Sequence, residues 1–219
     1  MILSISIREI FYRKIDFSKL VNKKNIYLYA GDVPKNEAYQ KFIGLSLTQS
    51  NFQHIKHDIT EIMPLPDQCV DIYQAEDVFE HIQLDEIPNI INEIYRVLKK
   101  GGVFRLSVPD YRCDLLENRT VKDDKGELIF DPLGGGNYEN GKVVGGGHIW
   151  FPKYETVKEL LSKTKFNNIN FLHYYDESGE AVTKPIDYSI GYVMRTPDND
   201  ERVSNPYRPM SIVVDCIKQ

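Results

Sequence analysis

The sequence is poor in cysteine, and none of its cysteines forms a recognisable pair. The three present, Cys69, Cys113 and Cys216, are far apart in a chain of 219 residues. This spacing argues against a disulfide framework and against a cysteine zinc site. Because free thiols persist in reducing compartments, we expect a cytoplasmic protein.

The chain also lacks an excess of basic residues and a long apolar run. Lysine and arginine total 27 against 32 acidic residues, which gives a net charge of −5, and no stretch is strongly basic. Since binding to a phosphate backbone depends on clustered cations, we expect no nucleic acid partner. Charged residues interrupt positions 1–21, a pattern that fits neither a signal peptide nor a membrane span. We therefore expect no membrane partner.

Several nucleotide-binding and metal-binding motifs are missing as well. Gly141-Lys142 is followed by Val143 instead of Ser or Thr, so this pair does not form a phosphate-binding loop. The fingerprint G-x-G-x-x-G does not follow the first predicted strand, which weakens an NAD-binding interpretation. No tight cluster of metal ligands is evident, so the sequence assigns no metal.

Apolar runs and amphipathic segments alternate along the chain. Runs suited to strands lie at 26–30, 42–47, 52–55, 70–75, 103–108, 169–175, 187–195 and 210–217. In the clearest helix, Ile87, Ile90, Ile91 and Ile94 recur at helical spacing before Gly101-Gly102 stops it. Shorter helices are predicted near 7–11, 34–42 and 154–161. This alternation predicts a parallel sheet with helices on both faces and an antiparallel C-terminal edge.

One long segment interrupts the alternation. Residues 111–147 lose apolar periodicity and contain glycine triplets at 134–136 and 145–147. Long loops in compact domains often act as lids or binding loops. We expect a single domain over 1–219, with a loop insertion at about 111–147 that carries a hairpin near 128–130.

The stretch from 63 to 110 carries a specific set of motifs. It contains Leu65-Pro66-Asp67, then Asp71 in a strand, then Phe79-Glu80-His81-Ile82, and finally a helix that ends in Arg96-Val97-Leu98-Lys99-Lys100-Gly101-Gly102. This set resembles the class I, small-molecule methyltransferases that use S-adenosylmethionine (the methyltransferase type 11-like family). Lys100 stands where the family usually has proline. The resemblance implies an α/β, Rossmann-like fold with a mostly parallel seven-stranded sheet, helices on both faces and an antiparallel C-terminal edge.

The resemblance also implies where the cofactor S-adenosylmethionine binds. In open α/β sheets, ligands lie at the carboxyl ends of the strands. The family's glycine-rich first loop corresponds to residues 30–34, which hold one glycine, and Ser46 stands where the family has an acid for the ribose. Asp58 matches the acid near the adenine. The implied cofactor-binding residues are Ala30, Gly31, Asp32, Ser46, Asp58, Ile59, Ala75 and Glu76.

Methyl transfer needs alignment of the reactants and, for an oxygen acceptor, a base. The candidates for catalysis are Asp77, His81 and His148, by the positions that the fold implies. Two of them have a structural alternative. Glu80-His81 would begin a helix and cap it or pair with a neighbouring loop, and His148 would pack against Trp150 and the following helix.

We interpret the sequence as an S-adenosylmethionine-dependent methyltransferase that acts on a small molecule, with O-methylation of a sugar or glycan precursor as the specific expectation. The alternative is a non-catalytic partner subunit whose cofactor binding is weakened or lost, because the first loop is thin and Ser46 replaces an acid. The sequence leaves open whether the chain forms a homo-oligomer or serves as a partner subunit.

Overall fold

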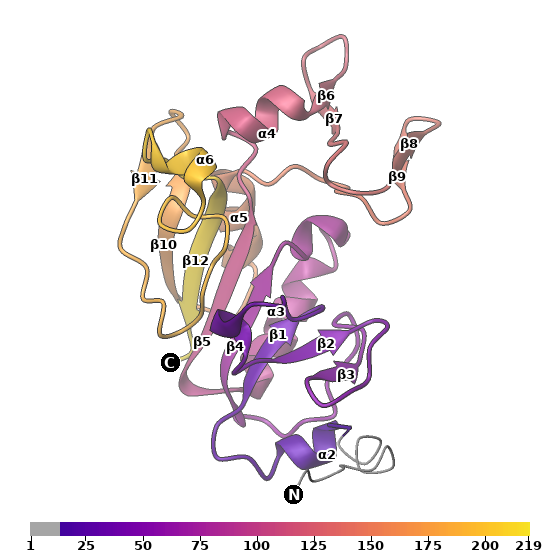
Figure 1. Cartoon of the computed structure of the whole chain (residues 1–219), viewed down its shortest axis with the longest axis vertical. Helices are drawn as coiled ribbons and strands as arrows, with labels where there is room; N and C mark the ends of the chain where they lie inside the picture. The colour runs from indigo at the N-terminus through magenta and orange to yellow at the C-terminus, as the bar shows by residue number, and fades with distance from the viewer. Residues whose placement is uncertain (1–13) are drawn as a thin grey trace, which may run out of the picture.

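The computed structural model describes residues 14–219, so the helix predicted near 7–11 lies outside the described residues. The strands of its central sheet are β1 (Tyr27–Ala30), β2 (Ile43–Ser46), β3 (His54–Lys56), β4 (Val70–Glu76), β5 (Leu98–Pro109), β10 (Asn168–Tyr175), β11 (Ala181–Thr183) and β12 (Ser211–Ile217). Their spatial order is β11-β10-β12-β5-β4-β1-β2-β3 (Figure 1).

Strands β1 to β5 pair in parallel, and the C-terminal edge is antiparallel as predicted. Strand β12 runs antiparallel to β5 and to β10, and β10 runs antiparallel to β11. The sheet has eight strands where seven were expected, because the chain turns back after β10 to form β11. The α/β, mostly parallel architecture predicted from the alternation of elements is confirmed.

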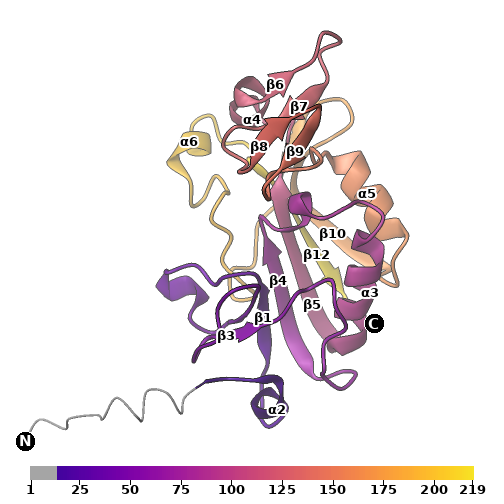
Figure 2. The same cartoon turned by 90° about the vertical axis from the view of Figure 1, so that its right-hand side faces the viewer.

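The longer helices, α3 (Ile87–Val97) and α5 (Tyr154–Ser162), lie on one face of the sheet (Figure 2). In α3, Pro88 occupies the first turn, where its missing N–H costs no hydrogen bond. The isoleucines at helical spacing in α3 are all buried against the sheet. This apolar stripe therefore positions the chain that connects β4 to α3.

The opposite face of the sheet is covered mainly by irregular chain. The helix expected over 34–42 is a single 3-10 turn, η1 (Glu37–Tyr39), and its Tyr39 packs with Tyr29 and Phe42. The rest of this face is covered by residues 187–194, where the sequence predicted a strand. That prediction was wrong.

The reason lies in side chains of the sheet that occupy the hydrogen-bonding groups of this segment. The Gln74 side chain donates to the carbonyl of Tyr192 at 2.6 Å, and the Arg105 guanidinium donates to the carbonyls of Asp187 at 2.9 Å and Gly191 at 2.5 Å. The carbonyls of this segment are thus bound by side chains of the sheet instead of by a neighbouring strand.

The predicted loop at 111–147, called the insertion below, is more ordered than expected. It holds α4 (Asp114–Arg119) and two hairpins, β6 (Val121–Lys122) with β7 (Leu128–Phe130) and β8 (Asn137–Glu139) with β9 (Lys142–Val144). These elements lie at one end of the sheet in both views (Figures 1 and 2). The remaining short helices are α2 (Phe17–Leu20), η2 (Phe79–His81) and α6 (Glu201–Ser204). Within residues 14–219, no helix has both the length and the apolar character that a bilayer crossing requires.

Candidate functional site

A cavity of about 500 Å³ opens at the carboxyl ends of the parallel strands. We call it the first cavity. Its walls come from Gly31 after β1, Leu45 and Leu47 at the end of β2, 57–60 after β3, Asp77 and Val78 after β4, then 81–83, Glu86, and Gly146 of the insertion. The position agrees with the rule for ligand sites in open α/β sheets.

The loop after β1 approaches the cavity with bare backbone. Gly31 has φ +84°, and a Cβ atom there would meet only Val78, at 3.7 Å. The loop is fixed from behind, because the Val33 N–H donates to Nε2 of the buried His54 at 3.0 Å. Gly44 allows this close approach, since a Cβ atom there would lie 2.6 Å from the His54 ring. Sequence reasoning missed both His54 and Gly44.

Ser46 does not line the first cavity. Its hydroxyl is fully buried and accepts hydrogen bonds from the N–H groups of Thr48 at 3.1 Å and Gln49 at 2.8 Å. The pKa of Asp32 is lowered, chiefly by a hydrogen bond from Ser46. An ionised carboxylate of the first loop therefore lies beside Ser46 at the end of β2.

The residues after β3 form part of the wall of the first cavity. Asp58 and the buried Ile59 line the first cavity. The Asp58 carboxylate accepts hydrogen bonds from the backbone N–H of Thr60 at 2.9 Å and from its hydroxyl at 2.8 Å. The neighbouring His57 is also in the wall, and its buried Nε2 atom has no hydrogen-bond partner among residues 14–219.

The residues at the end of β4 divide between the core and the cavity. Ala30 of β1 and Ala75 of β4 are fully buried in the main core. Glu76 faces the other way from the cavity, because its carboxylate accepts hydrogen bonds from the Tyr39 hydroxyl at 2.6 Å and the Met194 N–H at 2.7 Å. Burial raises the pKa of Glu76. Glu76 thus ties η1 to the C-terminal segment.

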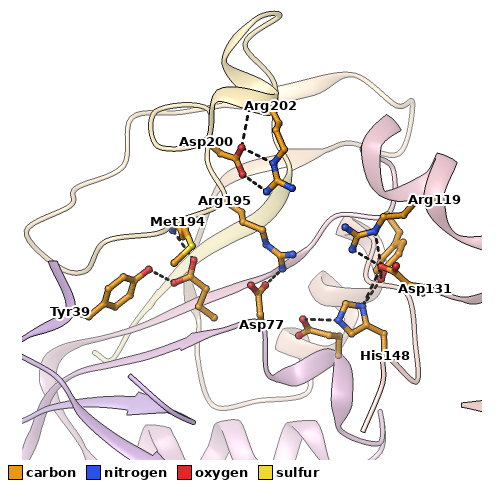
Figure 3. A network of polar contacts seen from close by, with 12 residues as sticks. Tyr39, Asp77, Arg119, Asp131, His148, Met194, Arg195, Asp200 and Arg202 are labelled. Carbon is orange, nitrogen blue, oxygen red and sulfur yellow. Dashed lines mark hydrogen bonds and ion pairs between the residues drawn. The ribbon is translucent and has the colours of Figure 1, made fainter. Parts of the chain in front are cut away.

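Asp77 lines the first cavity and pairs with Arg195 (Figure 3). Its φ of +56° lies in the left-handed region, where aspartate is tolerated better than most residues. Burial lowers the pKa of Arg195 to about 10, and its Nε atom has no partner within the described residues. Sequence reasoning missed Arg195, which fell in the wrongly predicted strand.

A second polar cluster lies beside the cavity and joins η2 to the insertion. His81 lines the first cavity, whereas Glu80 is fully buried and His148 is 6% exposed. The Nε2 atom of His148 lies 3.6 Å from a carboxylate oxygen of Glu80. Burial raises the pKa of Glu80 to about 8 and lowers that of His148 to about 4.

His148 is held in place from its other side. Its Nδ1 atom contacts the Tyr111 hydroxyl, which donates to Asp131 at 2.6 Å. Arg119 donates to the same Asp131 oxygen at 2.6 Å (Figure 3). The His148 ring meets the rings of His81 and Tyr111 edge to face.

A second cavity, also of about 500 Å³, lies between the hairpins of the insertion, the η2–α3 connection and the segment 149–151. The two hairpins contribute Leu128, Tyr138 and Lys142 to its wall, and Phe151 closes it from the following segment. Gln83 lines both cavities, so the two are neighbours.

Comparisons with known proteins agree with this architecture. Residues 25–106 match a family model described as a methyltransferase domain. A protein of Mycolicibacterium smegmatis named "Probable S-adenosylmethionine-dependent methyltransferase" is 31% identical over 91 residues, which make up 37% of this chain and 34% of that protein. The chain thus spans about a third of the length of this curated relative.

Solved structures extend the likeness over nearly the whole chain. An S-adenosylmethionine-dependent methyltransferase of Thermotoga maritima superposes with a TM-score of 0.51 at 16% identity, covering 93% of this chain and 86% of that one. Another, from Mesorhizobium loti, gives a TM-score of 0.51 at 15% identity over 88% of this chain and 90% of that one. At these identities the likeness is one of fold. The Rossmann-like methyltransferase fold implied by the sequence motifs is confirmed.

Proposed function

We propose that this chain is an S-adenosylmethionine-dependent methyltransferase that acts on a small molecule. The observation that carries the proposal is the first cavity, which lies at the carboxyl ends of β1 to β4 with the Gly31 backbone open to it. Its volume is within the range of about 300–1,000 Å³ typical of ligand pockets. The family match over 25–106 covers the strands that build this cavity.

The residues present fit the methyl donor. Gly31 leaves open space for the methionine portion, and the unpartnered Nε2 atom of His57 offers a polar contact in the wall. We assign Asp58 and Ile59 to the adenine end, as the resemblance implies. Bound there, S-adenosylmethionine supplies a methyl group already activated by its sulfonium, so the protein needs mainly to align the acceptor.

The ribose end of the cavity departs from the family pattern. Because Ser46 is buried and already hydrogen bonded, it does not replace the family's acid directly. The ionised Asp32 beside it provides the only negative charge that the first loop brings to the end of β2 within the described residues. We assign to Asp32 the hydrogen bond to the ribose hydroxyls.

We assign the second cavity to the acceptor. It adjoins the first cavity through Gln83, and its wall combines the aromatic rings of Tyr138 and Phe151 with the cation of Lys142. Aromatic rings with polar tips suit a ring-shaped, hydroxylated acceptor. A sugar or glycan precursor methylated on oxygen is the class that we propose. The cluster of Glu80, His81 and His148 would assist removal of the proton from its hydroxyl, since His81 lines the first cavity.

The three unpaired cysteines of the chain support the cytoplasmic location expected from the sequence.

Calorimetric titration with S-adenosylmethionine and S-adenosylhomocysteine tests the proposal. Gly31→Arg fills the cavity and should abolish binding. Gly126→Arg is the matched control, because Gly126 has a similar φ of +83° in the β6–β7 turn, with no atom within 4 Å of an added Cβ. The donor site is supported if the wild-type protein and the Gly126→Arg variant bind these ligands and the Gly31→Arg variant does not.

Absence of binding by the wild-type protein would favour the non-catalytic partner subunit, an alternative that the single glycine and the occupied Ser46 hydroxyl motivate. Equal binding by the Gly31→Arg variant would refute our placement of the donor. Tighter binding of NAD than of S-adenosylmethionine and S-adenosylhomocysteine would replace the methyltransferase proposal with an NAD-binding one.

A further inference from the structure

Three side chains with ligating atoms converge beside the first cavity. Glu80 and His81 come from η2, and His148 follows the second glycine triplet of the insertion. One ligand atom from each lies within 4.8 Å of the others. The rings of His81 and His148 meet edge to face, with centroids 4.8 Å apart. We call these three residues the ligand triad.

The hydrogen bonds behind His148 fix its tautomer. The Tyr111 hydroxyl has one proton, which it donates to Asp131. Arg119 binds the same carboxylate and helps to keep it ionised. The Tyr111 oxygen can therefore only accept the hydrogen bond that it shares with Nδ1 of His148, so Nδ1 carries the proton and donates. The Nε2 atom of His148 consequently carries a lone pair, and this lone pair faces Glu80.

The buried atoms that meet in the ligand triad lack hydrogen-bond partners within the described chain. Glu80 is fully buried, and neither of its carboxylate oxygens has a hydrogen-bond partner within the described chain. The same holds for the buried Nδ1 atom of His81. An unsatisfied buried polar group costs about 1–3 kcal/mol. A cation placed between these atoms would satisfy all three at once.

We propose that Glu80, His81 and His148 bind one divalent transition-metal cation of the zinc class. Two imidazoles and one carboxylate form the ligand set of catalytic zinc sites that keep a coordination position open. Hard cations such as Mg²⁺ prefer sets made of oxygen atoms. In tetrahedral geometry, ligands bound at about 2.1 Å lie about 3.4 Å apart, so binding draws a pair that is 4.8 Å apart closer by about 1.4 Å.

The surroundings supply the outer hydrogen bonds that such a site needs. Metal-ligating histidines usually donate their second N–H to a carboxylate, a carbonyl or water, which orients the ring. Here His148 donates to the Tyr111 oxygen, and the Tyr111 hydroxyl in turn donates to the Asp131 carboxylate. A cation held by the ligand triad would lie at the wall of the first cavity, because His81 lines that cavity while Glu80 is buried beside it.

The cation site stands on the geometry of the ligand triad, whereas the role that we assign to the cation rests on the proposed function. A hydroxyl bound to such a cation loses its proton to water more readily, because the cation stabilises the oxyanion. This would prepare an acceptor oxygen for methyl transfer beside Asp77 and Val78, which share the cavity wall with His81.

Titration of the untagged, chelator-treated full chain with Zn²⁺ and with Co²⁺ tests the site. We expect one equivalent to bind, with Mg²⁺ binding far more weakly, and a Co²⁺ visible spectrum that reports nitrogen and oxygen ligands. Glu80→Gln keeps the shape of the side chain but removes the carboxylate that would bind the cation, and it should abolish stoichiometric binding, as should His148→Gln. Tyr111→Phe should weaken binding about 10–100-fold.

His57→Gln is the matched control, because His57 lines the same cavity outside the ligand triad and its loss should leave metal affinity unchanged. Urea unfolding of each variant shows that it folds; Glu80→Gln removes an unpaired buried carboxylate and should not be less stable. Failure of the wild-type protein to bind either ion would overturn the proposal, and so would binding that survives both Glu80→Gln and His148→Gln.

Titration of the same samples with S-adenosylhomocysteine separates the two proposals. If the protein binds metal but not S-adenosylhomocysteine, the cation site is supported and the proposed function is refuted. If it binds S-adenosylhomocysteine but neither Zn²⁺ nor Co²⁺, only the cation site is refuted.

Discussion

Arg195 pairs with Asp77, a residue 118 positions earlier in the chain. The pair joins the C-terminal segment to the residue that follows β4 in the wall of the first cavity. It fixes an aspartate whose backbone is in the left-handed region. The shape of the cavity wall thus depends on a segment outside the motifs that carry the resemblance to the methyltransferases.

We expect Asp77→Asn to lower the free energy of unfolding by about 1–3 kcal/mol, because Arg195 loses a charged hydrogen-bond partner. Asp77→Ala should cost about 1 kcal/mol more, since alanine tolerates a positive φ poorly. Urea unfolding of both variants measures the difference. Equal losses of unfolding free energy in the two variants would mean that the positive φ at position 77 adds nothing to the cost of the alanine substitution.

We expect His54→Gln to alter the pH dependence of stability. Burial lowers the pKa of His54, so the folded state keeps the ring neutral while the unfolded state takes up a proton near its ordinary value of about 6.5. Stability from His54 is therefore present above about pH 6.5 and is lost as the pH falls below it. The wild-type protein should lose more stability than the variant between pH 7 and pH 5. Parallel losses in urea unfolding at the two pH values would contradict this.

We expect Arg105→Met to cost about 3–5 kcal/mol, because it leaves a buried charge without its partner. Arg105 is fully buried and makes two hydrogen bonds to Asp215, at 2.7 and 2.6 Å. The double variant Arg105→Met with Asp215→Leu should recover much of this loss, since an apolar pair replaces the ion pair. If the double variant instead loses the sum of the unfolding free energies lost by the two single variants, the hydrogen bonds from Arg105 to the carbonyls of 187 and 191 contribute more to stability than its ion pair with Asp215.

We expect His148→Ala to reduce turnover with a methyl acceptor by about 100-fold or more, the usual contribution of a group that assists proton removal. Affinity for S-adenosylhomocysteine should change little, because His148 is absent from the wall of the first cavity. Steady-state kinetics and calorimetry on one preparation separate the two effects. Unchanged turnover would leave His148 with a packing role.

The parts of the fold that follow from local periodicity could be predicted from the sequence. The isoleucines of α3 mark its buried face without reference to any other element. The run at 187–195 looks equally suited to a strand, yet Gln74 and Arg105 hold its carbonyls. No local pattern reports such contacts, because the donors are more than 80 residues away.

The candidate site likewise has a part that could be predicted from the sequence and a part that could not. Gly31, Asp58, Ile59, Asp77 and His81 line the first cavity, since topology alone brings the strand ends together. The chain between β2 and β3 turns back on the Ser46 hydroxyl, which removes Ser46 from the wall. The meeting of Glu80 with His148 depends on how the insertion packs against η2, and Glu80 was not among the residues predicted to act.

The irregular segment 187–194 has a further consequence. Side chains of the sheet, namely Gln74, Glu76 and Arg105, supply hydrogen bonds that hold it. A helix retains its internal hydrogen bonds when it lifts from a sheet, whereas this segment keeps few of its own. It should therefore open and close as a single cooperative unit, and its amide protons should exchange with solvent together, well before those of α3.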